Sequence, residues 1–129
     1  MPRRARLFLT LGSIAALTAV LAGAFGAHAL RPIIAPDFLP AYRTGVEYHF
    51  YHALGLMLVG LAALRVPESR CLNGAGWSML AGVVLFSGSL YLLALTGIRW
   101  LGAITPIGGI CFMLAWGLFA ASLVKAPGP

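Results

Sequence analysis

The segment LFLTLGSIAALTAVLAGAFGAHA, residues 7–29, decides the fold class of this chain. It contains no acidic residue, lysine or arginine, and it is longer than the roughly 20 apolar residues that a helix needs to cross a hydrocarbon core about 30 Å thick. In lipid a helix satisfies its own backbone hydrogen bonds, whereas a single strand or a loop does not. The segment therefore predicts a transmembrane helix.

Three further segments repeat this pattern, at 45–64, 75–96 and 101–124. The 129 residues are 60% hydrophobic and only 9% charged, whereas soluble domains have about a quarter charged residues. Little sequence is left between the segments for a soluble domain. We therefore expect one transmembrane domain over residues 1–129, an all-α integral membrane four-helix bundle whose main partner is the lipid bilayer.

The basic residues indicate an orientation rather than nucleic-acid binding, because they lie at helix ends and not along one aromatic face. In a chain that crosses four times, Arg31, Arg43 and Arg99 fall on one side of the membrane. Six others fall on the side of the two termini: Arg3, Arg4, Arg6, Arg65, Arg70 and Lys125. The positive-inside rule then predicts that both termini lie in the cytoplasm.

The N-terminal segment also imitates a secretory signal, with Ala27-His28-Ala29 in place of a cleavage site. Its apolar run exceeds the roughly 7–15 residues of a signal core. We expect the first helix to stay uncleaved.

Small residues predict where helices approach one another, since membrane helices associate through close backbone contact. On the first helix they recur every four residues, at Ala15, Ala19, Gly23 and Ala27. Gly88 and Gly109 are expected to do the same on the third and fourth helices. The stripe on the first helix fits a neighbour in the same chain or in a second copy, so a homo-oligomer is a candidate.

Two further features of the helices are expected from residue type. Pro106 would lie inside the fourth helix, where its missing N–H leaves the Gly102 carbonyl without a donor and kinks the helix. Trp77, Trp100 and Trp116 would anchor helix ends at the membrane interface.

Polar side chains concentrate at the end of the bundle away from the termini, where they are costly unless they pair. The candidate site residues there are His28, Glu47, Tyr48, His52, Ser89, Tyr91 and Thr105. On a helix, Tyr48 and His52 share one face, while Glu47 points away from His49. The partner of Glu47 must come from elsewhere, and His28 and Arg43 are candidates by depth.

Three roles for these polar residues stay open. They could form a hydrogen-bonded clasp between helices, which we favour, or a proton or small-solute pathway through Glu47 and His28 or His52. A metal or haem site on His28, His49 and His52 is the third role, although the spacing of these histidines is unspecific. We expect no cofactor and no metal.

Enzyme activity is not expected either, because the sequence has no Ser/His/Asp signature and no phosphate-binding glycine loop. A membrane hydrolase with Ser89 as nucleophile and His52 as base is the remaining catalytic alternative.

Four motifs resemble one known family, in order along nearly the whole chain. They are GAFGAH (23–28), TGVEYHFYH (44–52), LFSGSLYLLAL (85–95) and TPIGG (105–109). They are similar to the small four-helix membrane proteins of unknown function typified by bacterial YgdD and related to eukaryotic transmembrane protein 256. The resemblance implies a multi-pass protein of the bacterial inner membrane with an uncleaved first helix, and it implies no biochemical activity.

The positions that match the family pattern include most of the candidate site residues. They are His28, Glu47, Tyr48, His52, Ser87, Gly88, Ser89, Tyr91, Thr105, Pro106 and Gly109. His49 is not part of that pattern, so the resemblance favours Glu47, His28 and His52 over a site with several histidines.

Overall fold

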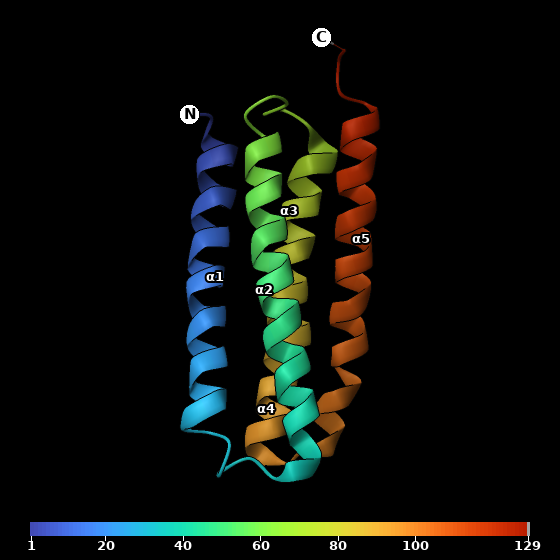
Figure 1. Cartoon of the computed structure of the whole chain (residues 1–129). Coiled ribbons are helices and arrows are strands. Elements are labelled where there is room, and N and C mark those ends of the chain that lie inside the picture. Colours follow the sequence, from blue (N-terminus) through green and yellow to red (C-terminus); the bar gives the residue numbers. More distant parts are fainter. Residues whose placement is uncertain (129) are drawn as a thin grey trace.

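The computed structural model describes residues 1–128 and shows helices that run side by side (Figure 1). The α-helices are α1 (Arg3–His28), α2 (Leu39–Ala62), α3 (Arg70–Gly82), α4 (Gly88–Thr96) and α5 (Thr105–Val124). A π-helical stretch, η2 (Val83–Ser87), joins α3 and α4 into one rod, and the 3₁₀ turns η1 (Pro36–Phe38) and η3 (Arg99–Ala103) precede α2 and α5. Residues 1–128 form no strand, which confirms the predicted all-α four-helix bundle.

The first three rods begin earlier than hydrophobicity alone predicted, at Arg3, Leu39 and Arg70 instead of residues 7, 45 and 75. In α2 the first turn contains a proline, which is tolerated there because its N–H would have no partner anyway. At α3 the Ser69 hydroxyl caps the helix by accepting a hydrogen bond from the Leu72 N–H at 3.2 Å. The helices extend into polar residues at these ends, which a prediction from hydrophobicity leaves out.

Three rods are long and apolar enough to cross a membrane: Arg3–His28, Arg70–Thr96 and Arg99–Val124. The expectation that four segments are long and apolar enough to cross a membrane is therefore corrected for the second segment. Helix α2 has 24 residues, which is a sufficient length, but its first half carries charged and polar side chains, including Arg43 and Glu47. Figure 1 shows α2 running alongside the other rods along the bundle.

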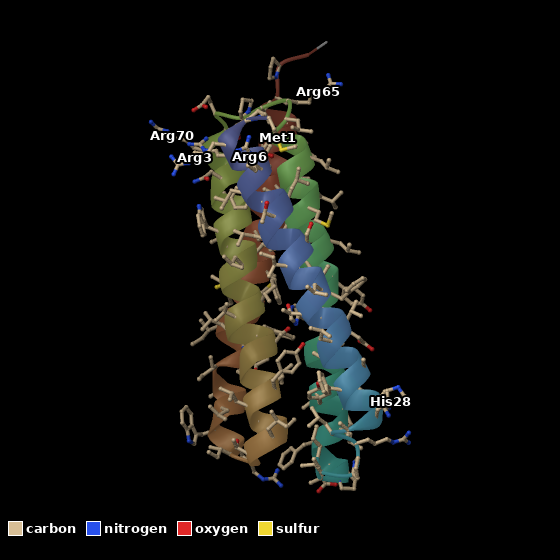
Figure 2. All side chains as sticks on the ribbon, turned by 90° about the vertical axis from the view of Figure 1, so that its left-hand side faces the viewer. Met1, Arg3, Arg6, His28, Arg65 and Arg70 are labelled. Carbon is tan, nitrogen blue, oxygen red and sulfur yellow. The ribbon has the colours of Figure 1, made fainter. Side chains whose placement is uncertain are left out.

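Both termini lie at one end of the bundle, and the 29–38 connection lies at the other (Figure 1). Figure 2 shows Arg3, Arg6, Arg65 and Arg70 gathered at the end of Met1. The apolar core lies nearer this end and includes Phe8, Leu56 and Met79, all with no exposed surface. A smaller apolar cluster of Ile34, Tyr42 and Ala94 lies near the 29–38 connection.

Close backbone contact joins α1 to α2 in the same chain. A Cβ on Gly12 would lie 2.9 Å from the carbonyl oxygen of Ala53, so only glycine fits at this crossing. Ala15 and Ala19 continue the contact and are 8% and 1% exposed. Farther along the small-residue stripe, a Cβ on Gly23 would lie 3.5 Å from Val46, and Ala27 is exposed.

The contact between α5 and the third rod depends on a neighbour of the residue named from the sequence. A Cβ on Gly108 would lie 2.7 Å from the Cα atom of Phe86. A Cβ on Gly109 would come only within 4.0 Å of the Phe86 ring, and one on Gly88 would meet nothing within 4 Å. Gly108 therefore sets the approach, because it faces the π-helical stretch that carries Phe86.

Pro106 lies in the first turn of α5, so its predicted position in the interior of a continuous helix was wrong, although the rod is interrupted at this point. The fourth rod instead changes from the 3₁₀ turn η3 to α-helix at this point, since a 3₁₀ turn followed by a new helix start avoids the hydrogen bond that proline cannot donate.

The three tryptophans lie at different kinds of position. Trp100 lies in η3 at the bundle end and is 67% exposed, in keeping with an interface position. Trp77 lies within α3 and packs edge-on against the Phe8 ring. Trp116 lies within α5 and binds a side chain of α2, so its predicted role as an end anchor was wrong.

Candidate functional site

His49 is the centre of a hydrogen-bonded chain that links three helices. The side chain is 8% exposed. Its Nδ1 lies 2.8 Å from the Tyr91 hydroxyl on α4, and its Nε2 lies 3.1 Å from the Thr18 hydroxyl on α1. We call Thr18, His49 and Tyr91 the clasp.

The direction of the protons in the clasp follows from what each hydroxyl can do. The Thr18 hydroxyl lies 2.9 Å from the Ala15 carbonyl oxygen and donates its one proton to the backbone of α1. It must therefore accept from Nε2–H of His49, which leaves Nδ1 to accept the proton of Tyr91. Both ring nitrogens of His49 are then hydrogen-bonded, and the imidazole is neutral.

Side chains around Tyr91 hold it in place. Its ring lies 5.3 Å from the Tyr42 ring, measured between centroids. A Cβ on Gly45 would lie 3.0 Å from the Tyr91 ring, so α2 offers a glycine where that ring passes. The Ser87 hydroxyl, 1% exposed, donates to the Gly45 carbonyl oxygen at 2.7 Å and ties the third rod to α2 next to the clasp.

His52 belongs to a second arrangement, where α2 meets α5. Its Nδ1–H donates to the Tyr48 carbonyl oxygen at 2.7 Å, and its Nε2 accepts from Nε1–H of Trp116 at 3.1 Å. The imidazole lies flat on the Phe112 ring, with centroids 3.5 Å apart and planes 9° apart. These contacts use both ring nitrogens and hold His52 neutral, as a joint between α2 and α5.

Ser89 and Thr105 join α4 to α5. Their hydroxyl oxygens are 2.6 Å apart, and Ser89 also donates to the Phe86 carbonyl oxygen at 2.9 Å. Ser89 therefore accepts from Thr105. In the part of the chain that the structure describes, no hydrogen bond connects Ser89 with His52, so the nucleophile and base of the hydrolase alternative are not assembled.

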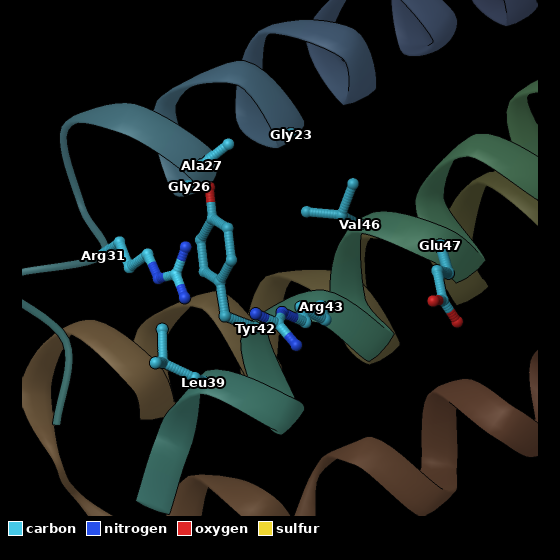
Figure 3. A pocket seen from close by; sticks show the side chains of 9 residues that line it. All are labelled: Gly23, Gly26, Ala27, Arg31, Leu39, Tyr42, Arg43, Val46 and Glu47. Carbon is cyan, nitrogen blue, oxygen red and sulfur yellow. The ribbon is translucent and has the colours of Figure 1, made fainter. Parts of the chain in front are cut away.

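Glu47 and His28 lie outside these contacts. Glu47 is exposed, and among residues 1–128 its carboxylate forms no hydrogen bond or ion pair. It lines a pocket of about 310 Å³ with Tyr42, Arg31 and Arg43, between the end of α1 and the start of α2 (Figure 3). His28 is exposed and points away from the bundle (Figure 2). His52 lines a different, aromatic groove with Tyr48.

The three histidines do not form a metal site. Within residues 1–128 no group of three or more histidine, cysteine, aspartate or glutamate side chains is arranged to hold a metal ion. His28 points outward, and both ring nitrogens of His49 and of His52 are within hydrogen-bonding distance of other groups. The arrangement favours helix–helix contact over ligation.

Comparison with known proteins places this chain in a family. Residues 22–109 match the family described as protein of unknown function DUF423. The chain is also similar to UPF0382 membrane protein YwdK of Bacillus subtilis, at 49% identity over 120 residues, which covers 93% of this chain and 98% of that relative. The chain belongs to the DUF423 family.

Other relatives of this DUF423 member carry the same kind of name. UPF0382 membrane protein SH2409 of Staphylococcus haemolyticus is 44% identical over 95% of this chain and 99% of its own length. UPF0382 membrane protein SSP2132 of Staphylococcus saprophyticus is 44% identical over 86% of this chain and 91% of its own. These names give membrane location and no activity. No solved structure matches the chain.

Sequence reasoning missed the central residues of the clasp. It set His49 aside because the family motif lacks it, and it did not consider Thr18, which lies in the middle of an apolar run. One signal was available: a threonine, a histidine and a tyrosine at matching depth on neighbouring helices can satisfy one another in lipid. Trp116 gave no such signal, because tryptophan is common at membrane interfaces.

Proposed function

We propose that this protein has a structural or interaction role in the membrane, as a bundle whose helices are fixed to one another by the clasp. The observation that carries the proposal is the Thr18–His49–Tyr91 chain, which joins α1, α2 and α4 through one ring. Both ring nitrogens of His49 and the Tyr91 hydroxyl are taken up by these hydrogen bonds, and the His49 side chain is buried, whereas Thr18 is exposed and also donates to the backbone of α1. The partner surface would be the lipid or another protein that meets the exposed apolar faces.

The test combines stability with flux. His49→Phe keeps an aromatic ring and removes both nitrogens, so it should lower the stability of the purified protein in detergent. Liposomes that contain the parent protein should show only the background flux of protons and small solutes. A flux well above that of empty liposomes, abolished by His49→Phe with the helical content intact, would overturn the structural role.

Transport through Glu47 is the second candidate, and one observation favours it: Glu47 is unpaired within the described residues and lines an open pocket. Against it, His52 lines another groove and His28 points outward. Glu47 and the two histidines therefore do not line one continuous pathway. A pH-driven flux that Glu47→Gln removes would support transport.

The orientation and location follow from charge and resemblance. The proposal places the chain in the inner membrane of a bacterium, with both termini in the cytoplasm. Six of the nine basic residues lie at the end of the bundle that holds the termini, and such residues favour the cytoplasmic side. The kinship with YgdD-like proteins and transmembrane protein 256 is part of the same proposal. Reporter fusions at the C-terminus and in the 29–38 connection test the orientation, and opposite signals from the two are expected.

A further inference from the structure

A pocket between the end of α1 and the start of α2 has no part in the clasp. It encloses about 310 Å³, and Gly23 and Ala27 on α1 leave room for it by their small size. Its other lining residues include Arg31, Arg43 and Glu47, which are exposed, so the pocket opens to the surroundings.

Tyr42 forms a fixed wall of this pocket. The residue is 5% exposed, and its hydroxyl donates to the Ala22 carbonyl oxygen on α1. A side chain at Gly26 would collide with the Tyr42 ring. Tyr42 therefore fixes the separation of α1 and α2. The pocket beside it is part of the packed structure.

The charges in the pocket have no partners. The guanidinium group of Arg31 lies beside the Tyr42 ring in Figure 3, and Arg43 extends from the adjacent turn of α2. Among the residues described, 1–128, the ion pair found is Arg4–Glu68 at the other end of the bundle, so neither arginine is neutralised. Two unpaired guanidinium groups beside one cavity attract an anion, and arginine binds phosphate and carboxylate oxygens in pairs.

We propose that this pocket binds the phosphate group of a phosphate ester between Arg31 and Arg43. Two guanidinium groups and the Glu47 carboxylate leave the pocket with a net positive charge, which favours an anionic phosphate group. The pocket lies where α1 ends and α2 begins (Figure 3), and paired arginines at such a position can hydrogen-bond the oxygens of a phosphate headgroup. Both a phospholipid and a soluble phosphate ester present this chemistry.

Glu47 limits how deep the anion can lie. It follows Arg43 by four residues on α2, which is about 6 Å farther from the start of the helix. A carboxylate at that depth repels phosphate and confines it to the arginine end. Removing this charge therefore strengthens binding, an effect opposite to that expected if Glu47 were itself a ligand for the bound group.

The experiment measures lipid binding to the full chain in neutral detergent. Phosphatidylglycerol is titrated into the purified protein, and native mass spectrometry counts the adducts at each concentration. The parent protein should hold one lipid more tightly than any further ones. The Arg31→Gln/Arg43→Gln variant should lose about tenfold or more in affinity for it, because two charge-assisted hydrogen-bonding groups are removed.

Two matched variants make the result specific. Arg99→Gln removes a charge at the same end of the bundle, where Arg99 lies over the Phe38 ring and outside the pocket, and it should bind like the parent. Glu47→Gln should bind more tightly than the parent. Equal binding by the parent and the double arginine variant, or an equal loss in Arg99→Gln, would overturn the site.

A second experiment distinguishes a phospholipid from a soluble phosphate ester. Glycerol 1-phosphate is added to the parent protein with and without bound phosphatidylglycerol. Tight lipid binding that glycerol 1-phosphate does not displace assigns the pocket to a phospholipid headgroup; binding of glycerol 1-phosphate alone, lost in the double arginine variant, assigns it to a soluble ester. Binding of neither probe overturns the proposal. Circular dichroism of each variant shows whether the bundle is folded when binding is measured.

Discussion

The Tyr91 hydroxyl lies 2.8 Å from Nδ1 of His49, although the two residues are 42 positions apart in the sequence. The opposite nitrogen of the same ring reaches Thr18 on α1. One neutral imidazole, itself 8% exposed, therefore couples three helices. Substitutions in this chain should act on the stability of the whole bundle.

Tyr91→Phe should lower the free energy of unfolding by about 1–2 kcal/mol, because Nδ1 of His49 loses its donor while the ring packing is kept. Unfolding by sodium dodecyl sulfate in mixed micelles, followed by circular dichroism, measures the change. Tyr51→Phe is the control: Tyr51 is 55% exposed, and its substitution should change stability by less than about 0.5 kcal/mol. Equal effects of the two changes would refute the clasp.

Thr18→Val and Tyr91→Phe should not be additive. Both act through the same ring of His49, so a double-mutant cycle should give an interaction free energy of about 0.5 kcal/mol or more. The same micelle unfolding assay supplies all four values. Strict additivity would mean that the two hydrogen bonds form independently and that His49 does not couple α1 to α4.

Gly108→Ala should destabilise the bundle by about 1–3 kcal/mol, because the new Cβ would lie 2.7 Å from the Cα of Phe86 and the backbones would have to separate. Gly117→Ala lies on the same helix and its Cβ would meet nothing within 4 Å, so it should be neutral or slightly stabilising through helix propensity. Thermal unfolding of both proteins in one detergent makes the comparison. The contact would be disproved by a Gly108→Ala protein as stable as the parent.

Trp116→Phe should cost about 1 kcal/mol, since Nε2 of His52 then lacks the Trp116 donor. Trp100→Phe changes a residue that is 67% exposed and should fall within about 0.5 kcal/mol of the parent. Chemical unfolding in detergent micelles ranks the two. Trp100→Phe proving the more harmful would show that interface anchoring outweighs the joint between α2 and α5.

Glu47→Gln should leave the free energy of unfolding within about 0.5 kcal/mol of the parent, because its exposed carboxylate has no partner in residues 1–128. This is the reverse of what a clasp built on Glu47 would give. The measurement is the same unfolding transition at neutral pH, with Tyr91→Phe as the destabilised reference. A loss as large as that of Tyr91→Phe would mean that Glu47 bears on the helix contacts after all.

Several features of the candidate site were readable from the sequence. Polar groups were expected to gather at the end away from the termini, and Ser89 and Thr105 do lie there and bind each other. Tyr91 was expected to need a partner, and it has one. The partner, His49, could not be identified from the sequence, because the spacing of Glu47 and His49 shows that they face different ways but not which of them faces α1 and α4.

The amino-acid sequence by itself determined that this chain is an all-α membrane protein with four helical rods, because length and hydrophobicity add up along the chain and lipid permits no open backbone. It also determined that the basic residues near the termini lie at one end. Only the tertiary structure decided that His49, and not Glu47, joins the helices, and that Glu47 lines a pocket with Arg31 and Arg43. The reason is rotational: which face each helix turns toward its neighbours depends on close contacts such as Gly12 with Ala53 and Gly108 with Phe86, which form only when the rods pack together.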